Sequence, residues 1–444
     1  MIVRFCLYGF LKNQRYFEPF LVLVLLDKGL DFLDVGLLVA TRELVVNLLE
    51  VPSGAVADLW GRRSSLMLAF VAYLVSFGTF HGADSFPWLV LAMALYGVGD
   101  AFRSGSHKAI LFDWLAAQGR QGEKARVYGL TRSWSQLGSA VSVVIATAIV
   151  LGDGSYRRIF LLSMLPYTLA LVNFLGYPAE PERGASPSLS RVAQHLVATF
   201  RQCLRVPPLR RLLAESMLQR GAYTLSKDYL QPVVERYALA LPLLIPAAVV
   251  LGAGGASGAS PEGLDPIQQT ALWVGAVSFA LYLLASLATR QAHRVEGWVG
   301  GPTRTARALW LANLGLFGVL ALGLGPLATM TPELPSTVTT LLVIAAFVGV
   351  AVVQNLWKPL FLARVDEASD AALGATILSI DSQAKALFMM VAAPTLGWAV
   401  DSWGLAAVGC FGVFLALIGL ATLGGESRCP RGSHGHPETN QPGL

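Results

Sequence analysis

Long apolar segments recur along this chain of 444 residues, and each is bounded by charged residues, glycine or proline. A helix needs about 20 largely apolar residues to cross the hydrocarbon core of a bilayer. Six such segments lie at 5–26, 32–57, 64–82, 87–112, 125–150 and 157–177, and six more lie at 210–235, 267–289, 305–327, 336–363, 371–400 and 404–424. The pattern predicts an all-α integral membrane protein with twelve transmembrane helices in two sets of six.

The composition agrees with this prediction and argues against a soluble protein. Hydrophobic residues make up 54% of the chain and charged residues 14%, whereas soluble chains carry about 25% charged residues. The net charge of +5 does not indicate a nucleic-acid partner, because the basic residues lie in short clusters between the apolar segments. We therefore expect the lipid bilayer as the surroundings of the chain, and a monomer.

The polar stretch between the two sets of segments is rich in arginine and begins with proline, glycine and serine. We predict an N-terminal bundle over residues 1–177, a cytosolic linker over 178–209 that is partly helical from 189 to 205, a C-terminal bundle over 210–424 and a disordered cytosolic tail over 425–444. The apolar segment 239–251 is an alternative thirteenth crossing. Pro242 and Pro246 favour a segment at the outer face instead.

The orientation follows from lysine and arginine, which are retained on the cytoplasmic side of a membrane. With the N-terminus inside, the predicted outer loops carry Lys28, Arg157 and Arg158. The predicted inner loops carry many more basic residues, namely Arg62, Arg63, Arg120, Lys124, Arg126, the six linker arginines, Arg290, Arg294, Arg304, Arg307 and Arg364. We expect a multi-pass protein of the cell inner (plasma) membrane with both termini cytoplasmic. Since Lys12 and Arg15 interrupt the first apolar segment, we expect no cleavable signal peptide.

The loop between the second and third segments carries a motif. It consists of Gly54, Asp58, Gly61, Arg62 and Arg63, and it resembles the signature loop of the major facilitator superfamily, which joins helices two and three. The loop departs from the family pattern at Leu59, where a basic residue is usual. The resemblance implies two six-helix bundles, each built from inverted three-helix repeats, that rock around a central substrate site.

Each residue of this loop also has a physical interpretation. We expect Gly54 to allow close packing of a neighbouring helix and Gly61 to allow a tight turn. Asp58 can form a contact with Arg62, Arg63 or a helix terminus in one conformation and release it in another, as a switch would. The alternative is that the two arginines are topology anchors alone.

Ionisable residues also lie inside the apolar segments, where a central charge costs about 2.5–3.5 kcal/mol on insertion scales unless it is paired or hydrated. We predict that they line a path for substrate and protons. The candidates are Lys12, Arg15, Glu43, Glu50, Asp100, Arg103, His107, Arg132, Arg220, Lys227, Asp228, Lys358, Asp381 and Lys385. Asp100, Arg103 and His107 have the spacing of one helix face.

These charges have two possible interpretations. Either they line the path for substrate and protons, or some of them form structural ion pairs, for example Asp381 with Lys385, four residues apart. Bases outnumber acids among the deeper positions, which indicates an anionic or zwitterionic small-molecule substrate. The family resemblance adds that helices one, four, seven and ten line the central path, and each of these predicted helices carries charge.

The sequence indicates transport driven by a gradient. A phosphate-binding GxxxxGK[ST] loop does not occur in the chain, so we expect secondary transport of a small solute by alternating access. Protons are the expected coupling ion, with Glu43, Glu50, Asp100 or Asp381 as carriers and His107 as the group with the reference pKa nearest neutrality. We favour export over import.

The sequence also leaves two other functions open. A multidrug/proton antiporter for lipophilic cations is one alternative, although the predicted fifth helix lacks the Gly-Pro pair that is typical of drug antiporters in the superfamily. A non-transporting sensor on the same fold is another. We predict no enzyme activity, cofactor or metal site, because the sequence has no HExxH motif and its histidines are scattered.

Overall fold

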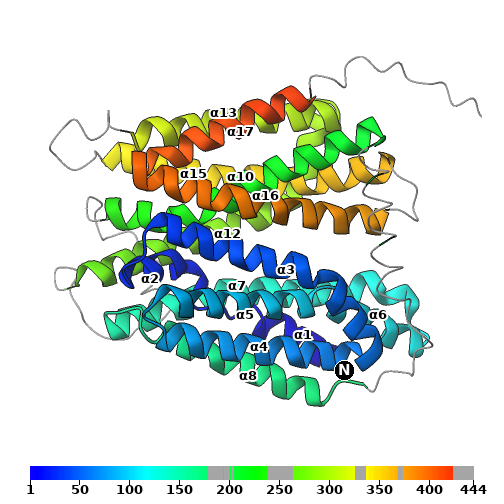
Figure 1. The fold of residues 1–444 in the computed structure, drawn as a ribbon. Helices are drawn as coiled ribbons and strands as arrows, with labels where there is room; N and C mark the ends of the chain where they lie inside the picture. Colours follow the sequence, from blue (N-terminus) through cyan, green and yellow to red (C-terminus); the bar gives the residue numbers. More distant parts are fainter. Residues whose placement is uncertain are drawn as a thin grey trace, which may run out of the picture.

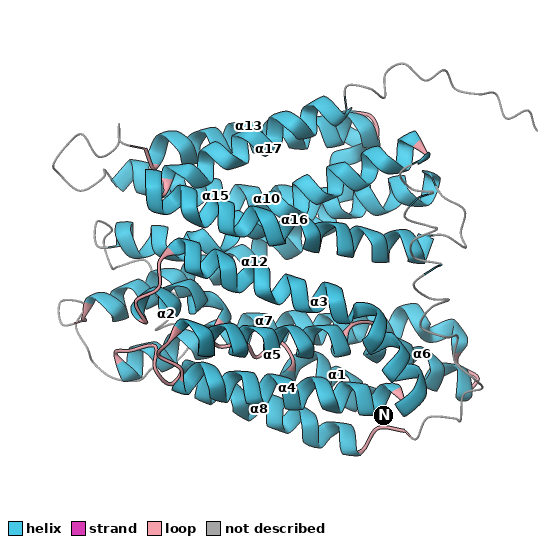
Figure 2. Ribbon diagram, in the orientation of Figure 1, coloured by secondary structure: helices cyan, strands magenta, loops and turns pink. Residues whose placement is uncertain are grey.

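The computed structural model describes residues 1–178, 205–238, 264–325, 337–368 and 374–423, with the single residues 194 and 201. Several predictions fall elsewhere in the chain: most of the linker, the segment 239–251 and the tail 425–444 lie outside the described residues, as does the side chain of Asp58. The described residues form helices arranged in two groups (Figures 1 and 2).

The first group covers the predicted N-terminal bundle. Its elements are α1 (Ile2–Leu11), η1 (Glu18–Phe20), α2 (Leu21–Asp27), α3 (Phe32–Trp60), α4 (Arg62–Gly82), α5 (Phe86–Arg103), α6 (Ser106–Ala117), η2 (Gln121–Glu123), α7 (Lys124–Asp153) and α8 (Ile159–Leu175). Buried aromatic residues fill its core, where Tyr73 packs edge to face against Phe70 and Tyr167, and Phe77 does so against Tyr167.

The second group covers the predicted C-terminal bundle. Its elements are α10 (Pro207–Ala238), α12 (Pro266–Val299), α13 (Pro302–Gly323), α15 (Thr337–Ala368), α16 (Gly374–Trp403) and α17 (Ala406–Leu423). By length and mean hydropathy, six of the described helices could cross a membrane on their own, including α4, α12 and α17. Each of the twelve predicted apolar segments is matched by helix in the described residues.

Two predicted continuous segments are broken, which corrects the sequence analysis. The segment 5–26 divides into α1 and α2, because Asn13 and Gln14 leave the helix and donate to the carbonyls of Ser135 and Gly138 on α7, at 2.6 and 2.9 Å. The segment 87–112 divides at Ser104 into α5 and α6. Both breaks expose backbone polar groups and place charged side chains beside the centre of the protein.

One basic residue was also misplaced. Arg364, predicted in an inner loop, lies within α15 and is 6% exposed. It pairs with Glu215 of α10 at 2.8 Å, and Trp357 Nε1 donates to the same carboxylate at 2.7 Å. A buried base needs such a partner, so this residue also stabilises the packing of α10 against α15 at the inner end of the C-terminal bundle.

The two groups meet through α3 against α16 and α7 against α12 (Figure 1). We name the end of the helices that carries the turns 28–31, 83–85, 154–158 and 404 the outer side, following the orientation that the charges predict. The opposite end, with Gly61 and the turn 118–123, is the inner side. The N-terminus and α6 lie at this inner end, on the right of Figure 1.

Close contacts join the two bundles on the outer side. A Cβ on Gly397 of α16 would lie 2.1 Å from the carbonyl oxygen of Phe32, so only glycine lets the two helices approach this closely. The carboxylate of Asp401, at the end of α16, accepts hydrogen bonds from the backbone N–H groups of Phe32 and Leu33 at 3.1 and 2.8 Å. A side chain of one bundle therefore caps the first turn of a helix in the other.

Candidate functional site

Two cavities lie at the level where the helices are broken. The larger, of ≈ 540 Å³, is lined from the N-terminal bundle by Lys12, Arg132 and Ser139 and from the C-terminal bundle by residues such as Tyr282 and Asn355. The smaller, of ≈ 370 Å³, extends toward the inner side, and its lining includes Glu50, Asp100, Arg103, His107 and Lys385. Lys12 contributes to both cavities. The helix break after Leu11 is what brings this lysine to their junction.

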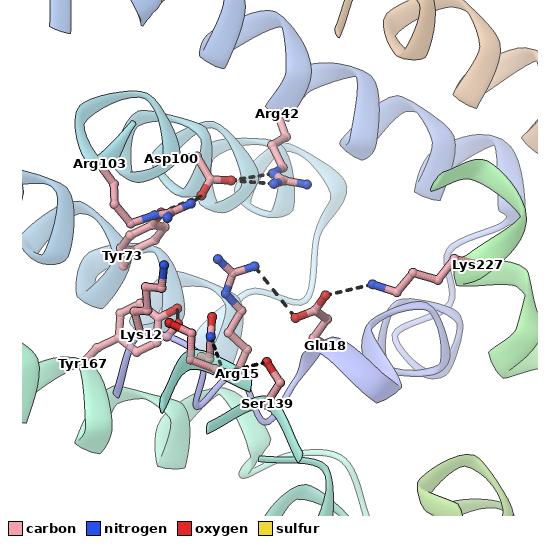
Figure 3. Close-up of polar contacts among 12 residues, drawn as sticks. Lys12, Arg15, Glu18, Arg42, Tyr73, Asp100, Arg103, Ser139, Tyr167 and Lys227 are labelled. Carbon is pink, nitrogen blue, oxygen red and sulfur yellow. Dashed lines mark hydrogen bonds and ion pairs between the residues drawn. The ribbon is translucent and has the colours of Figure 1, made fainter. Parts of the chain in front are cut away.

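Asp100 is the centre of a charged cluster in the N-terminal bundle (Figure 3). Its carboxylate accepts from Arg42 Nε and Nη2 at 2.9 and 2.5 Å, from Tyr73 Oη at 2.6 Å and from Arg103 Nη2 at 3.0 Å. Arg103 Nε also donates to Tyr73 Oη at 2.9 Å. Two bases around one acid leave this cluster with a net positive charge, and charge-assisted bonds fix its geometry.

A second ion pair crosses from one bundle to the other. Lys227 Nζ of α10 lies 2.8 Å from Glu18 Oε1 of η1, and Arg15 approaches the same carboxylate at 3.8 Å (Figure 3). Gln231, one turn further along α10, accepts from the backbone N–H of Val22 and donates to the carbonyl of Glu18. These contacts join the outer half of the first broken segment to the C-terminal bundle.

Two further acids of the candidate set, Glu43 and Asp381, also have basic partners. Glu43 of α3 lies 3.3 Å from Lys385 of α16, again across the two bundles. Asp381 pairs with Arg220 of α10. The alternative pairing of Asp381 with Lys385 is wrong in this structure, because each of them binds a residue on another helix. Spacing along one helix did not reveal those partners.

Three bases differ from this pattern. Lys12 and Arg132 line the larger cavity, and Lys358 of α15 is exposed and within electrostatic range of Arg132, Arg220 and Asp381. Within the described ranges none of the three forms an ion pair with a carboxylate. The centre of the protein therefore carries positive charge that the described side chains do not neutralise.

His107 lies apart from Asp100 and Arg103, which corrects the prediction of one continuous helix face. The helix breaks between Arg103 and His107, and the imidazole stacks on Tyr8 with ring centroids 3.9 Å apart. Its Nε2 lies 3.1 Å from Tyr177 Oη. All three residues still line the smaller cavity or its wall.

The motif loop connects helices of the N-terminal bundle on the inner side. Gly61 has φ of +86° and forms the turn between α3 and α4, which confirms the predicted turn. Arg62 pairs with Asp113 of α6 at 2.9 Å, and Arg63 donates to the carbonyls of Leu175 and Tyr177 at the end of α8. A cation at this position suits the negative end of the helix dipole.

The expectation for Gly54 is wrong in this conformation. Among the described residues, a Cβ at this position would meet no atom within 4 Å, so none of the described parts of the neighbouring helices packs closely against it. Sequence reasoning also missed Tyr73 and the buried pair of Glu215 with Arg364. A tyrosine in an apolar helix does not indicate a charged partner. A glutamate in an apolar segment, such as Glu215, does indicate that a basic partner is needed.

Comparisons with known proteins agree with this architecture. The Major Facilitator Superfamily model matches residues 2–381. The chain belongs to this superfamily. With its long apolar helices it is an integral membrane protein. The "Uncharacterized MFS-type transporter YxaM" of Bacillus subtilis (strain 168) is 28% identical over 160 residues, which are 36% of this chain and 37% of that protein. The match thus spans little more than a third of the relative's length.

Solved structures of transporters share the fold over nearly the whole chain. A variant of the nucleoside transporter NupG superposes with a TM-score of 0.72, 12% identity, and 95% and 99% of the two chains covered. A variant of the peptide transporter POT superposes with a TM-score of 0.66 and 12% identity, and the match covers 95% of this chain and 93% of that one. A D-xylose-proton symporter superposes with a TM-score of 0.58 and 15% identity, and the match covers 94% of this chain and 95% of that one. At these identities the similarity establishes the fold and leaves the substrate open.

Proposed function

We propose that this protein is a secondary transporter that moves a small anionic or zwitterionic solute across the inner (plasma) membrane by alternating access, coupled to protons. The observation that carries the proposal is the set of three bases, Lys12, Arg132 and Lys358, that face the centre without a carboxylate partner in the described residues. Lys12 is half-buried, whereas Arg132 and Lys358 are exposed, and unpaired charges of one sign attract a ligand of the opposite sign. A substrate with a carboxylate or phosphate group would supply it.

The arrangement of contacts fits one state of an alternating-access cycle. The bundles touch through Gly397, Asp401 and Lys227 on the outer side, while the two cavities lie between the bundles and toward the inner side. With the charge-based orientation, this is a state whose cavity faces the cytoplasm. A solute would enter the cavity from that side and meet the three bases.

We further propose export as the direction of transport. An anion that leaves a cell moves with an inside-negative membrane potential, which contributes about 2.3 kcal/mol per charge for each 100 mV. Proton coupling adds to this driving force. The motif loop, with Asp58, Arg62 and Arg63, would act as the switch on the inner side when that side closes.

Ligand-induced stabilisation tests the charge of the substrate. The purified protein is melted in the presence of sugar phosphates, dicarboxylates, amino acids or lipophilic cations, because a ligand that binds the native state alone raises the Tm. We expect anions or zwitterions to raise it, and the shift to disappear in Arg132→Gln and Lys358→Gln. Arg126→Gln is the matched control, since Arg126 is exposed and outside both cavities.

The same panel of compounds serves to test transport. Stabilising compounds are tested for counterflow in liposomes that contain the protein. Stabilisation by lipophilic cations alone, unaffected by Arg132→Gln, would refute the anion site and support a multidrug antiporter. Binding without counterflow would support a non-transporting sensor.

A further inference from the structure

Helices α7 and α12, which join the two bundles on one side, touch near their outer ends and separate toward the inner side. A Cβ on Gly275 of α12 would lie 2.2 Å from Thr147 Oγ1 of α7. Gln268 Nε2 of α12 donates to the carbonyl of Leu151 at 2.8 Å. Nearer the inner side the larger cavity, of ≈ 540 Å³, is lined by both helices. The pair therefore forms a V that opens toward the inner side.

The other junction between the bundles, α3 with α16, stays in contact over a longer distance. Glu43 pairs with Lys385 at 3.3 Å. Nearer the inner side, Asn47 Nδ2 of α3 donates to the carbonyl of Gln383 of α16, also at 3.3 Å. Within the described ranges, the two junctions therefore differ, and the bundles are separated by the larger cavity on the side of α7 and α12.

Apolar side chains that face the outside of the protein form the edges of this opening. Leu137 of α7 and Leu283 of α12 both line the cavity, yet they are 53% and 54% exposed. Each belongs to a row of exposed apolar residues on one face of its helix, which includes Leu130 and Val144 on α7, and Phe279 and Leu287 on α12. Such a row is the surface that a spanning helix presents to lipid. We name the opening between Leu137 and Leu283 the lateral gap.

The bases of the proposed anion site lie nearer the inner surface than the lateral gap does. Arg132 precedes Leu137 by five residues on α7, which is about 8 Å along the helix axis. Lys12 lines the same cavity beside it. An amphiphile in a bilayer has the same order of groups, with its charged head at the interface and its chain toward the centre.

We propose that the solute is a single-chain amphiphilic anion whose carboxylate or phosphate head binds Lys12 and Arg132, whose chain lies in the lateral gap, and which enters from the inner leaflet. The inference rests on the proposed function, because it names the class of anion that these bases bind. The chain would exchange one apolar environment for another, while the head would gain two cationic partners.

Photolabelling tests where the chain lies. The protein in phosphatidylcholine nanodiscs is irradiated with a dodecanoate that carries a diazirine in its chain, and labelled residues are identified by mass spectrometry. We expect saturable labelling around Leu137 and Leu283. Leu165 of α8 is 62% exposed and outside the cavity, so it reports the background from lipid, and its labelling should rise in proportion to the probe.

Competition separates the contribution of the chain from that of the head. Each buried CH₂ contributes about 0.8 kcal/mol, which is about fourfold in Kd, so about four of them should make unlabelled dodecanoate on the order of 100-fold more effective than acetate. Dodecanol has the chain without the charge and should compete more weakly than dodecanoate. Dodecyl phosphate distinguishes the two heads, because the better competitor of the two acids identifies the preferred one.

Two variants complete the test. Arg132→Gln should weaken the saturable labelling about tenfold, as expected for the loss of a charged hydrogen-bond donor. The matched control Arg126→Gln lies on the same helix outside both cavities and should leave it unchanged. Leu137→Asn should weaken competition by dodecanoate but not by acetate. Labelling at the lateral gap that does not saturate, or that survives Arg132→Gln, would overturn the proposal.

The result is separable from the proposed function. If hydrophilic anions raise the Tm and acetate competes as well as dodecanoate, the amphiphile fails and the anion site stands. If neither hydrophilic anions nor dodecanoate bind, both proposals fail.

Discussion

The cap that Asp401 places on α3 predicts a measurable shift between conformations. Replacing Asp401 with alanine removes both hydrogen bonds to the N–H groups of Phe32 and Leu33. A helix cap contributes about 1 kcal/mol, within a range of about 0.5–2 kcal/mol. The N–H groups regain water once the bundles separate, so the loss falls on the state with a closed outer side. The ratio of open to closed should rise about fivefold.

The chain offers a matched control for this experiment. Asp31 caps the same helix from within the same bundle, since its carboxylate accepts from the N–H of Asp34 at 2.8 Å. Asp31→Ala weakens the first turn of α3 without removing a contact between the bundles. Spin labels at Ser85→Cys, directly before α5, and at Thr337→Cys, the first residue of α15, report the distance between the bundles on the outer side by double electron–electron resonance, since both positions are exposed there. Asp401→Ala should move population to the long distance and Asp31→Ala should not. An equal shift in both variants would refute the inter-bundle role.

Two further predictions concern stability and packing. Glu215→Gln leaves the buried Arg364 without a full counter-charge, so the unfolding free energy should fall by about 3–5 kcal/mol. Thermal melting in detergent should show a clearly lower Tm for this variant. Glu123→Gln, in an exposed pair, should leave the Tm unchanged. Gly397→Ala forces a methyl group against the carbonyl of α3, so outer-side distances should lengthen; Gly315→Ala, where a Cβ meets no atom within 4 Å, should leave them unchanged. Equal Tm values in the first pair, or equal distances in the second, would contradict these contacts.

Apolar periodicity was enough to predict the elements of the fold, because a span needs a fixed length of apolar residues. The breaks escaped this reasoning. Lys12 and Arg15 were recognised as interruptions, yet the sequence did not show that Asn13 and Gln14 would bind carbonyls of α7 and so end the helix. A contact between residues more than 120 positions apart depends on which helices are neighbours.

The same reason limits what could be predicted about the site. The sequence identified the charged residues but not all of their partners. Helical spacing relates residues on one helix, whereas several of the ion pairs in the described residues join two helices. Glu18 binds Lys227 across the bundles, and Asp381 binds Arg220 and not Lys385. These pairings decide which bases remain without a carboxylate partner among the described residues, and hence where we propose that an anion binds.

Because the first apolar segment is broken, its two parts have different neighbours. α1 packs on α7 and α8, whereas η1 and α2 contact α10 and α12 through Glu18, Val22 and Gln231. A cut of the polypeptide between residues 178 and 207 would therefore divide the sequence but not the contacts. The second part of the first thirty residues also stays bound to its own half, because Lys28 donates to the carbonyl of Ala83 at 2.6 Å and Phe20 packs on Tyr156. A rearrangement that separates the two halves on the outer side must therefore release Glu18 and Val22 from α10, while this part of the chain moves with the N-terminal bundle.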